Sequence, residues 1–170
     1  MLYICSWQTM EERATELGAT HVLSLLGVEG VPRTPDGIDR DRHLHLEVDD
    51  VVQPFAGYIA PSLEHVEEIL DFADRWNRDG PMMVHCYAGV SRSTAAALTI
   101  LCLYNEGREE QAARQLRALA PHAKPNRRIV AIADRAMGLD GRMVRAVEAL
   151  PPAEHYGLEG PLVALPIDLP

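Results

Sequence analysis

The segment at residues 82–105 constrains the fold more than any other part of the chain. Residues 82–84 are an apolar run that leads into His85 and Cys86, which predicts a short buried strand. A loop containing Gly89 follows, and residues 93–105 are small and apolar on nearly every side, which predicts a central buried helix. A strand that passes through a tight loop into a buried helix is typical of α/β proteins.

Strands and helices are predicted to alternate along the rest of the chain. Apolar runs or alternation predict strands at 2–5, 21–26 and 43–48, and helices are predicted at 9–16, from 61–62 to about 80, and at 109–119, 126–137 and 142–150. This order predicts a three-layer αβα fold with a small, largely parallel sheet of four or five strands. Ligands bind such sheets at the carboxyl ends of the strands, where Cys86 lies on one strand and Asp49 and Asp50 on another.

The length of 170 residues suits a single compact domain. We expect residues 1–150 to form that domain, because no repeat or linker divides them. Residues 151–170 carry five prolines, so we expect a C-terminal tail without regular structure.

Charge and cysteine content exclude several classes of protein. The formal net charge is -9 and the longest basic clusters are pairs such as Arg127-Arg128, so we expect neither nucleic acid nor a membrane surface as partner. Three cysteines with no regular spacing predict neither a disulfide framework nor a zinc site. The chain shows no signal peptide and no apolar run of membrane-spanning length, so we expect it in the cytoplasm, where thiols stay reduced.

The loop after Cys86 has the composition of an anion site. Backbone N–H groups in a loop between a strand and a helix point inward, toward the positive end of the helix dipole. The residues that we expect to bind a phosphate or another oxyanion are Tyr87, Ala88, Gly89, Val90, Ser91 and Arg92. Gly89 permits a backbone angle that other residues resist, and the planar guanidinium of Arg92 can hold two phosphate oxygens.

The same loop predicts covalent catalysis by Cys86. The field of the helix favours the nucleophilic thiolate. The thiolate would attack phosphorus to give a cysteinyl-phosphate, which water later hydrolyses. Ser93 can donate a hydrogen bond to the sulfur and ease its departure. The leaving oxygen needs a proton, so a carboxylic acid must approach from across the pocket. No metal or cofactor is needed for this reaction.

The segment H-C-x-x-G-x-x-R-S, written here as residues 85–93, resembles the signature of cysteine-based protein tyrosine phosphatases. The fuller C-Y-A-G-V-S-R-S is most similar to the compact dual-specificity group of bacterial type, over residues 1 to about 138. The resemblance implies a general acid in the loop after an upstream strand, where Asp50 stands, and Asp49 is the alternative. It also implies that Asn126, after Pro125, packs beside the phosphate loop.

The sequence departs from the resemblance at two places. Residues 127–130, Arg-Arg-Ile-Val, replace the usual aromatic residue and glutamine, and residues 50–61 differ from a typical compact acid loop. Arg127 and Arg128 either attract an anionic substrate or are ordinary surface charges.

Five further residues have competing interpretations. His85 is interpreted as a hydrogen-bonding residue that orients the loop. His43 and His45 would share a strand face and could bind a metal, although a solvated face is the better interpretation. Cys5 and Cys102 could protect Cys86 as a disulfide, although Cys102 better fits simple packing.

These features predict a phosphate monoester hydrolase that acts on phosphorylated protein, most favourably on phosphotyrosine, with serine or threonine as further targets. A module that binds phosphotyrosine without turnover is the non-enzymatic alternative. Arsenate reduction also uses a C-x5-R loop but needs resolving cysteines, and a rhodanese loop is one residue shorter. The sequence leaves the oligomeric state open and is compatible with a monomer.

Overall fold

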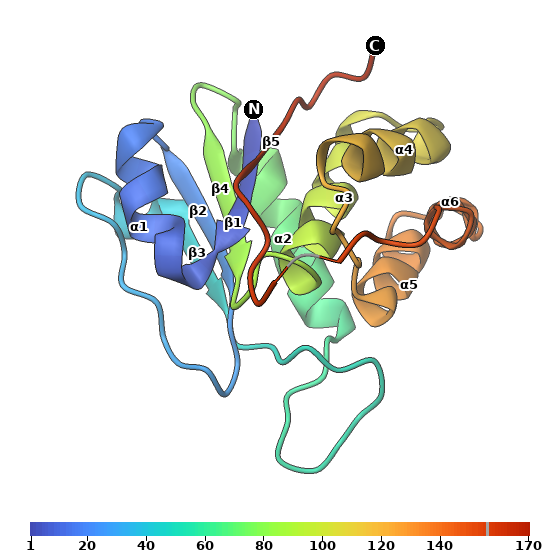
Figure 1. Ribbon diagram of the computed structural model, residues 1–170, viewed down its shortest axis with the longest axis horizontal. Coiled ribbons are helices and arrows are strands. Elements are labelled where there is room, and N and C mark those ends of the chain that lie inside the picture. The colour runs from blue at the N-terminus through green and yellow to red at the C-terminus, as the bar shows by residue number, and fades with distance from the viewer. Residues whose placement is uncertain (156) are drawn as a thin grey trace.

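A computed structural model of the chain describes residues 1–155 and 157–170. These residues form five strands, six α-helices and one 3₁₀ helix in the order β1 (Leu2–Ser6), α1 (Trp7–Glu16), β2 (His21–Leu25), η1 (Arg40–Arg42), β3 (His43–Leu46), α2 (Leu63–Arg75), β4 (Met82–Cys86), α3 (Arg92–Tyr104), α4 (Glu109–Leu119), α5 (Arg127–Ala136), α6 (Arg142–Glu148) and β5 (Val163–Leu165). Figure 1 shows the sheet between α1 on one side and helices α2 to α6 on the other.

The five strands form one sheet in the order β3-β2-β4-β1-β5. The first four are parallel, and β5 pairs antiparallel with β1. The prediction of a three-layer αβα fold with a largely parallel sheet of four or five strands is therefore confirmed. Parallel strands end at the same edge, so Cys86 at the end of β4 and the residues that follow β2 and β3 meet there.

The two faces of the sheet carry separate apolar layers. The smaller layer lies under α1 and includes Cys5, Met10, Val22 and Met83. The larger layer contains the other face of the sheet and the buried residues of α2 to α6. Helix α3 is buried from Arg92 to Cys102, as its small apolar sequence predicts, and it packs against β4, β1 and β2. This central helix fixes the position of the loop that precedes it.

The clearest differences from the predicted helix boundaries occur in α1 and α2. Helix α1 begins at Trp7 with Ser6 as its N-cap residue, rather than at Thr9. Helix α2 ends at Arg75, whereas we expected it to continue to about residue 80. Trp76 leaves the helical conformation with φ -75° and ψ 96°, is fully buried, and donates its indole N–H to the Gly80 carbonyl at 3.0 Å. Burial of this large side chain ends the helix.

The C-terminal segment is more ordered than we expected from its prolines. The expectation of a tail without regular structure was wrong, because Val163–Leu165 forms β5 at the edge of the sheet. Val163 and Leu165 are buried in the larger apolar layer. Asn105 at the end of α3 donates to the Ile167 carbonyl at 2.7 Å, and Gln115 of α4 donates to that of Pro166 at 2.8 Å. Apolar burial and side-chain hydrogen bonds therefore hold the proline-rich segment.

Among the described residues, no helix has both the length and the apolar character that crossing a membrane requires.

Candidate active site

The loop between β4 and α3 connects the carboxyl end of a buried strand to the start of a buried helix. Cys86 is the last residue of β4 and Arg92 is the first of α3. Between them Gly89 has φ +73°, and a Cβ atom there would lie 2.7 Å from the carbonyl carbon of Cys5. Both the positive φ and the close contact with β1 require glycine.

Four carbonyl groups of this loop are bound from outside by residues of three other segments of the chain. Those of Tyr87, Ala88, Val90 and Ser91 accept the backbone N–H groups of Trp7 (3.1 Å), Gly160 (2.9 Å), Lys124 (2.9 Å) and Asn126 (3.2 Å), in that order. No N–H group of residues 87–91 donates to another described residue. With the carbonyls directed outward, these N–H groups are available for an anion in the concavity.

Cys86 and Arg92 lie together at this loop, as their spacing predicts. The Oγ atom of Ser93 is 3.2 Å from the Sγ atom of Cys86, within hydrogen-bonding distance of sulfur. Once Cys86 is a thiolate, only the serine hydroxyl can donate in this pair. Cys86, Arg92 and Ser93 are each at most 2% exposed, so the reactive sulfur is reached only through the cavity at the loop.

Glu29 holds the guanidinium of Arg92, and sequence reasoning did not identify it. Its carboxylate accepts from Nη2 of Arg92 at 2.5 Å and from Nη1 at 3.1 Å, and Nη1 also donates to the Val48 carbonyl at 2.8 Å. The Nε atom of Arg92 is buried and has no hydrogen-bond partner among the described residues. The guanidinium is therefore fixed along one edge and keeps a donor for a ligand.

Charge pairing strengthens this contact. Burial alone would raise the pKa of Glu29, but hydrogen bonds from Arg92 and from the N–H of Gly27 lower it overall. Burial alone would lower the pKa of Arg92, and the carboxylate of Glu29 raises it overall. Both groups are therefore charged around neutral pH.

The structure separates the two aspartates that follow β3. Asp49 is 2% exposed, and its carboxylate accepts the N–H groups of Val28 at 2.8 Å and Ile59 at 2.6 Å. Asp50 instead lines the cavity that contains Cys86, and its Oδ1 atom accepts from Ser91 Oγ at 2.7 Å. The geometry thus gives Asp49 the role of closing the loop at 50–59, whereas Asp50 faces the phosphate loop.

Asn126 lies beside the phosphate loop, where the resemblance places it. Its side-chain oxygen caps α5 by accepting the N–H groups of Arg128 and Ile129, and its side-chain nitrogen donates to Asp50 Oδ1 at 2.7 Å. One residue therefore connects the start of α5, the phosphate loop and the candidate acid.

His85 is held by a chain of hydrogen bonds that the sequence did not predict. Its Nε2 atom is 2.6 Å from Ser24 Oγ, which lies 2.8 Å from His43 Nε2, and His43 Nδ1 is 2.8 Å from Thr34 Oγ1. Desolvation lowers the pKa of His85 to about 3 and that of His43 to about 4. Both imidazoles are therefore neutral at pH 7, and the chain fixes the ring of the residue before Cys86.

Two interpretations from the sequence lose support: a metal site at His43 and His45, and a protective disulfide between Cys86 and Cys5 or Cys102. His43 bonds to Ser24 and Thr34, whereas His45 lies 3.2 Å from the Leu26 carbonyl, and no cluster of three metal-ligating side chains occurs among the described residues. Cys5 belongs to the layer under α1 and Cys86 to the opposite layer. Cys5 and Cys102 are at most 2% exposed, and burial raises the pKa of each thiol to about 12, which fits the interpretation of both as packing groups.

The C-terminal segment forms one wall of the catalytic cavity. This cavity has a volume of about 560 Å³, and Glu154, His155, Gly157 and Leu158 line it together with the phosphate loop. A Cβ atom at Gly160 would lie 2.4 Å from Nε2 of His122. Sequence reasoning missed this wall because no local pattern connects residues 154–160 with residues 86–92.

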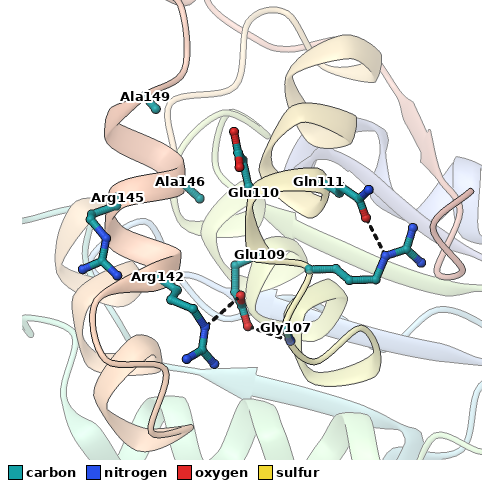
Figure 2. A pocket seen from close by; sticks show the side chains of 9 residues that line it. Gly107, Glu109, Glu110, Gln111, Arg142, Arg145, Ala146 and Ala149 are labelled. Carbon is teal, nitrogen blue, oxygen red and sulfur yellow. Dashed lines mark hydrogen bonds and ion pairs between the residues drawn. The ribbon is translucent and has the colours of Figure 1, made fainter.

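A separate cavity of about 700 Å³ lies between α4 and α6 (Figure 2). Arg142 of α6 donates to the buried carboxylate of Glu109 in α4 at 3.1 Å. Burial alone would raise the pKa of Glu109, but backbone hydrogen bonds and Arg142 lower it overall. The lining contains no nucleophile, and the ion pair joins the two helices.

A three-layer fold in which a cysteine and an arginine share one strand–loop–helix segment is the arrangement expected of the cysteine-dependent phosphatases. A family model described as "Tc-R-P: Polymorphic toxin system, DSP-PTPase phosphatase" matches residues 19–106, just over half of the chain. The chain belongs to this family of dual-specificity-type phosphatases.

Known proteins agree with this assignment. The chain is 26% identical over 127 residues to the tyrosine-protein phosphatase yvh1 of Schizosaccharomyces pombe, covering 74% of this chain but only 36% of that protein. Its fold is similar to that of human DUSP28, with a TM-score of 0.64, 19% identity and coverage of 83% of this chain and 94% of that one. It is also similar to the Yvh1 phosphatase domain of Chaetomium thermophilum, with a TM-score of 0.59, 22% identity and coverage of 84% and 93%.

Proposed function

We propose that this protein hydrolyses phosphate monoesters on phosphorylated proteins, phosphotyrosine above all, through a covalent intermediate on Cys86. One observation carries the proposal: Cys86 and Arg92 flank a loop in which four carbonyl groups accept N–H groups from other segments, while the loop's own N–H groups have no partner among the described residues. Such a loop matches the oxygens of a tetrahedral anion placed over the sulfur.

In the first step the Cys86 thiolate attacks phosphorus in line with the leaving oxygen. The S–P bond forms as the P–O bond to the substrate breaks, and the loop N–H groups and Arg92 hold the other phosphate oxygens. Asp50 donates a proton to the leaving oxygen. Its position in the same cavity as Cys86 supports this role.

In the second step water attacks phosphorus and the S–P bond breaks. The Asp50 carboxylate takes the proton of the attacking water, and Ser93, 3.2 Å from the sulfur, stabilises the departing thiolate. Phosphate leaves, and Cys86 and Asp50 return to their starting protonation states. All atoms come from the substrate, water and the protein, so the cycle needs no metal or cofactor.

The domain boundaries and cellular setting belong to the same proposal. Residues 1–150 carry the reacting groups, and residues 151–170 are a tail that completes the wall of the cavity. Three free buried cysteines fit a compartment in which thiols stay reduced, such as the cytoplasm. We propose that the chain acts on phosphorylated proteins or peptides.

The alternatives have less support. A binding module without turnover has no need of Cys86, Ser93 and Asp50 in one arrangement. Arsenate reduction needs a second thiol close to the first, but Cys5 lies on the opposite face of the sheet and Cys102 is buried within α3.

The test measures phosphate release from an aryl phosphate and from a phosphotyrosine peptide, with a metal chelator present. The native protein should turn over both substrates, and Cys86→Ser should turn over neither. Cys102→Ala is the matched control, because it removes another buried cysteine and should keep the activity. Equal turnover by the native protein and Cys86→Ser would refute the mechanism, and phosphopeptide binding without turnover by either would favour the recognition module.

A further inference from the structure

A second hollow adjoins the catalytic cavity. It has a volume of about 420 Å³ and shares Asp50, Ser91 and Lys124 with the catalytic cavity. We call it the side cleft; its remaining lining residues are Val52, Arg117, Pro125, Asn126, Arg127, Val147, Glu148, Leu150, Pro151, Pro152 and Ala153. Because the two cavities share a wall, a peptide that places its phosphorylated residue over Cys86 can reach the side cleft with a neighbouring residue. Adjacent residues of an extended chain are about 3.5 Å apart.

The side cleft is locally basic in an acidic protein. Three cations line it, Lys124, Arg127 and Arg117, against the two carboxylates of Asp50 and Glu148, whereas the whole chain has a net charge of -9. The Asp50 carboxylate already accepts hydrogen bonds from Ser91 and Asn126. Cationic side chains beside a substrate cavity attract anionic groups, and the effect weakens with salt.

Two of these cations are free to bind a ligand. Lys124 and Arg127 are exposed, and their side chains form no ion pair or hydrogen bond with any residue among 1–155 and 157–170. Lys124, the only lysine in the sequence, is fixed through its N–H group to the Val90 carbonyl at 2.9 Å. Its position relative to the phosphate loop is therefore defined.

The third cation and the neighbouring arginine have structural roles. Nη1 of Arg117 donates to the carbonyls of Pro121 and Ala123 at 2.6 and 2.8 Å, which holds the segment before Lys124. Arg128 donates to the Pro61 carbonyl at 2.6 Å and does not line the side cleft. Of the Arg127-Arg128 pair, only Arg127 is therefore placed to meet a substrate.

We propose that the side cleft is a substrate subsite for an anionic side chain, a carboxylate or a second phosphate, one or two residues from the phosphorylated residue. Lys124 and Arg127 determine this specificity. The inference rests on the proposed function, because it assumes a phosphorylated residue in the catalytic cavity. It adds a preference of sequence context to that activity.

The test compares phosphotyrosine peptides that carry glutamate, phosphoserine, alanine or lysine at the two positions on either side of the phosphotyrosine. The native protein should prefer the glutamate or phosphoserine peptides on one side, with a kcat/KM about tenfold above the alanine peptide at low salt. The two anionic series distinguish a carboxylate from a phosphate. Raising the salt to about 0.5 M should reduce the preference to about twofold.

The variants assign the preference to residues. Lys124→Gln and Arg127→Gln should each reduce it about threefold, and the double variant should abolish it. Arg127→Glu should reverse it in favour of the lysine peptides. Arg135→Gln is the matched control, because Arg135 is an exposed arginine of the same helix outside both cavities. The Arg127 variants and Arg135→Gln, whose residues lie outside the catalytic cavity, should keep the native rate on an aryl phosphate, which has no flanking residue.

Two results would overturn the subsite: equal kcat/KM for anionic and alanine peptides in the native protein, or an anionic preference that survives the double substitution. Binding of the same peptides to Cys86→Ser, followed by fluorescence anisotropy, tests the subsite without turnover. Failure of the proposed function would appear as aryl phosphate turnover that is absent or independent of Cys86. The two failures are thus distinguishable.

Discussion

Replacing Glu29 by alanine removes the carboxylate that holds the guanidinium of Arg92. In the native structure two hydrogen bonds of 2.5 and 3.1 Å join the groups, and the Arg92 side chain is 3% exposed while that of Glu29 is 20% exposed. Without Glu29 the Val48 carbonyl is the one acceptor that the guanidinium keeps among residues 1–155 and 157–170. We expect it to rotate between several positions, so that it no longer meets the phosphate oxygens in one fixed orientation.

The size of the effect follows from the type of bond lost. A hydrogen bond to a charged group contributes about 1.5–3 kcal/mol, and the partial exposure of Glu29 favours the lower half of that range. If one such contribution is lost from the transition state, kcat/KM for an aryl phosphate falls by about 10- to 40-fold, since ~1.4 kcal/mol corresponds to a factor of ten. Glu29→Gln keeps one acceptor oxygen and should lose less.

The assay is kcat/KM for an aryl phosphate together with inhibition by inorganic phosphate, and urea unfolding reports on stability separately. Glu29→Ala should weaken phosphate inhibition and lower kcat/KM, with Glu29→Gln between it and the native protein. The opposite result, tighter phosphate binding and faster turnover without the carboxylate, would refute this reasoning. It would mean that Glu29 competes with phosphate for Arg92.

Four further predictions concern the acid, the loops and the buried histidines. Asp50→Asn should lower kcat by about 100-fold or more on a phosphotyrosine peptide and less on an aryl phosphate with a good leaving group, as steady-state rates on both will show. Asp49→Ala should instead lower the free energy of unfolding by about 2 kcal/mol in urea, because two buried N–H groups lose their acceptor. Gly160→Ala should lower kcat/KM for both substrates, because its Cβ would displace the C-terminal segment from the phosphate loop. The free energy of unfolding should fall as the pH drops from about 6.5 toward 4. Desolvation lowers the pKa of His43 to about 4 and that of His85 to about 3, so the unfolded chain takes up protons that the folded chain does not. Urea unfolding at pH 7.5 and 5.0 measures this difference, and His43→Phe should make the free energy of unfolding less dependent on pH.

Local sequence sufficed for the fold and for the centre of the site. Most strands and helices have their own periodicity, so most boundaries before residue 150 were predicted to within one or two residues. Helix α2 was the exception, because the burial of Trp76 depends on tertiary packing. Cys86, Gly89 and Arg92 could be identified because strand, loop and helix are consecutive, and their spacing alone brings them together.

Residues whose partners lie far away in the sequence have no local pattern of this kind. Glu29 lies 63 positions from Arg92, in a loop of glycines and prolines where a single carboxylate looks like any surface charge. From the sequence, Ser24 is a single polar residue in an apolar strand. Its hydrogen bonds with His43 and His85 depend on the register of β2 with β3 and β4. The sequence also left Asp49 and Asp50 unresolved, because adjacent residues differ only in which way the backbone turns after the strand.

The hydrogen bonds of the phosphate loop explain why composition alone gave a wrong prediction for the C-terminal tail. An anion nest needs its N–H groups free and its carbonyls satisfied elsewhere, and a short loop cannot satisfy its own carbonyls. Here the acceptors find donors on Trp7, Lys124, Asn126 and Gly160, so the loop depends on segments before, after and far beyond it. Proline content predicts that a segment lacks internal hydrogen bonds, but it does not predict what the remaining N–H groups bind. At Gly160 one such N–H group completes the catalytic loop, and the C-terminal residues are therefore part of the site.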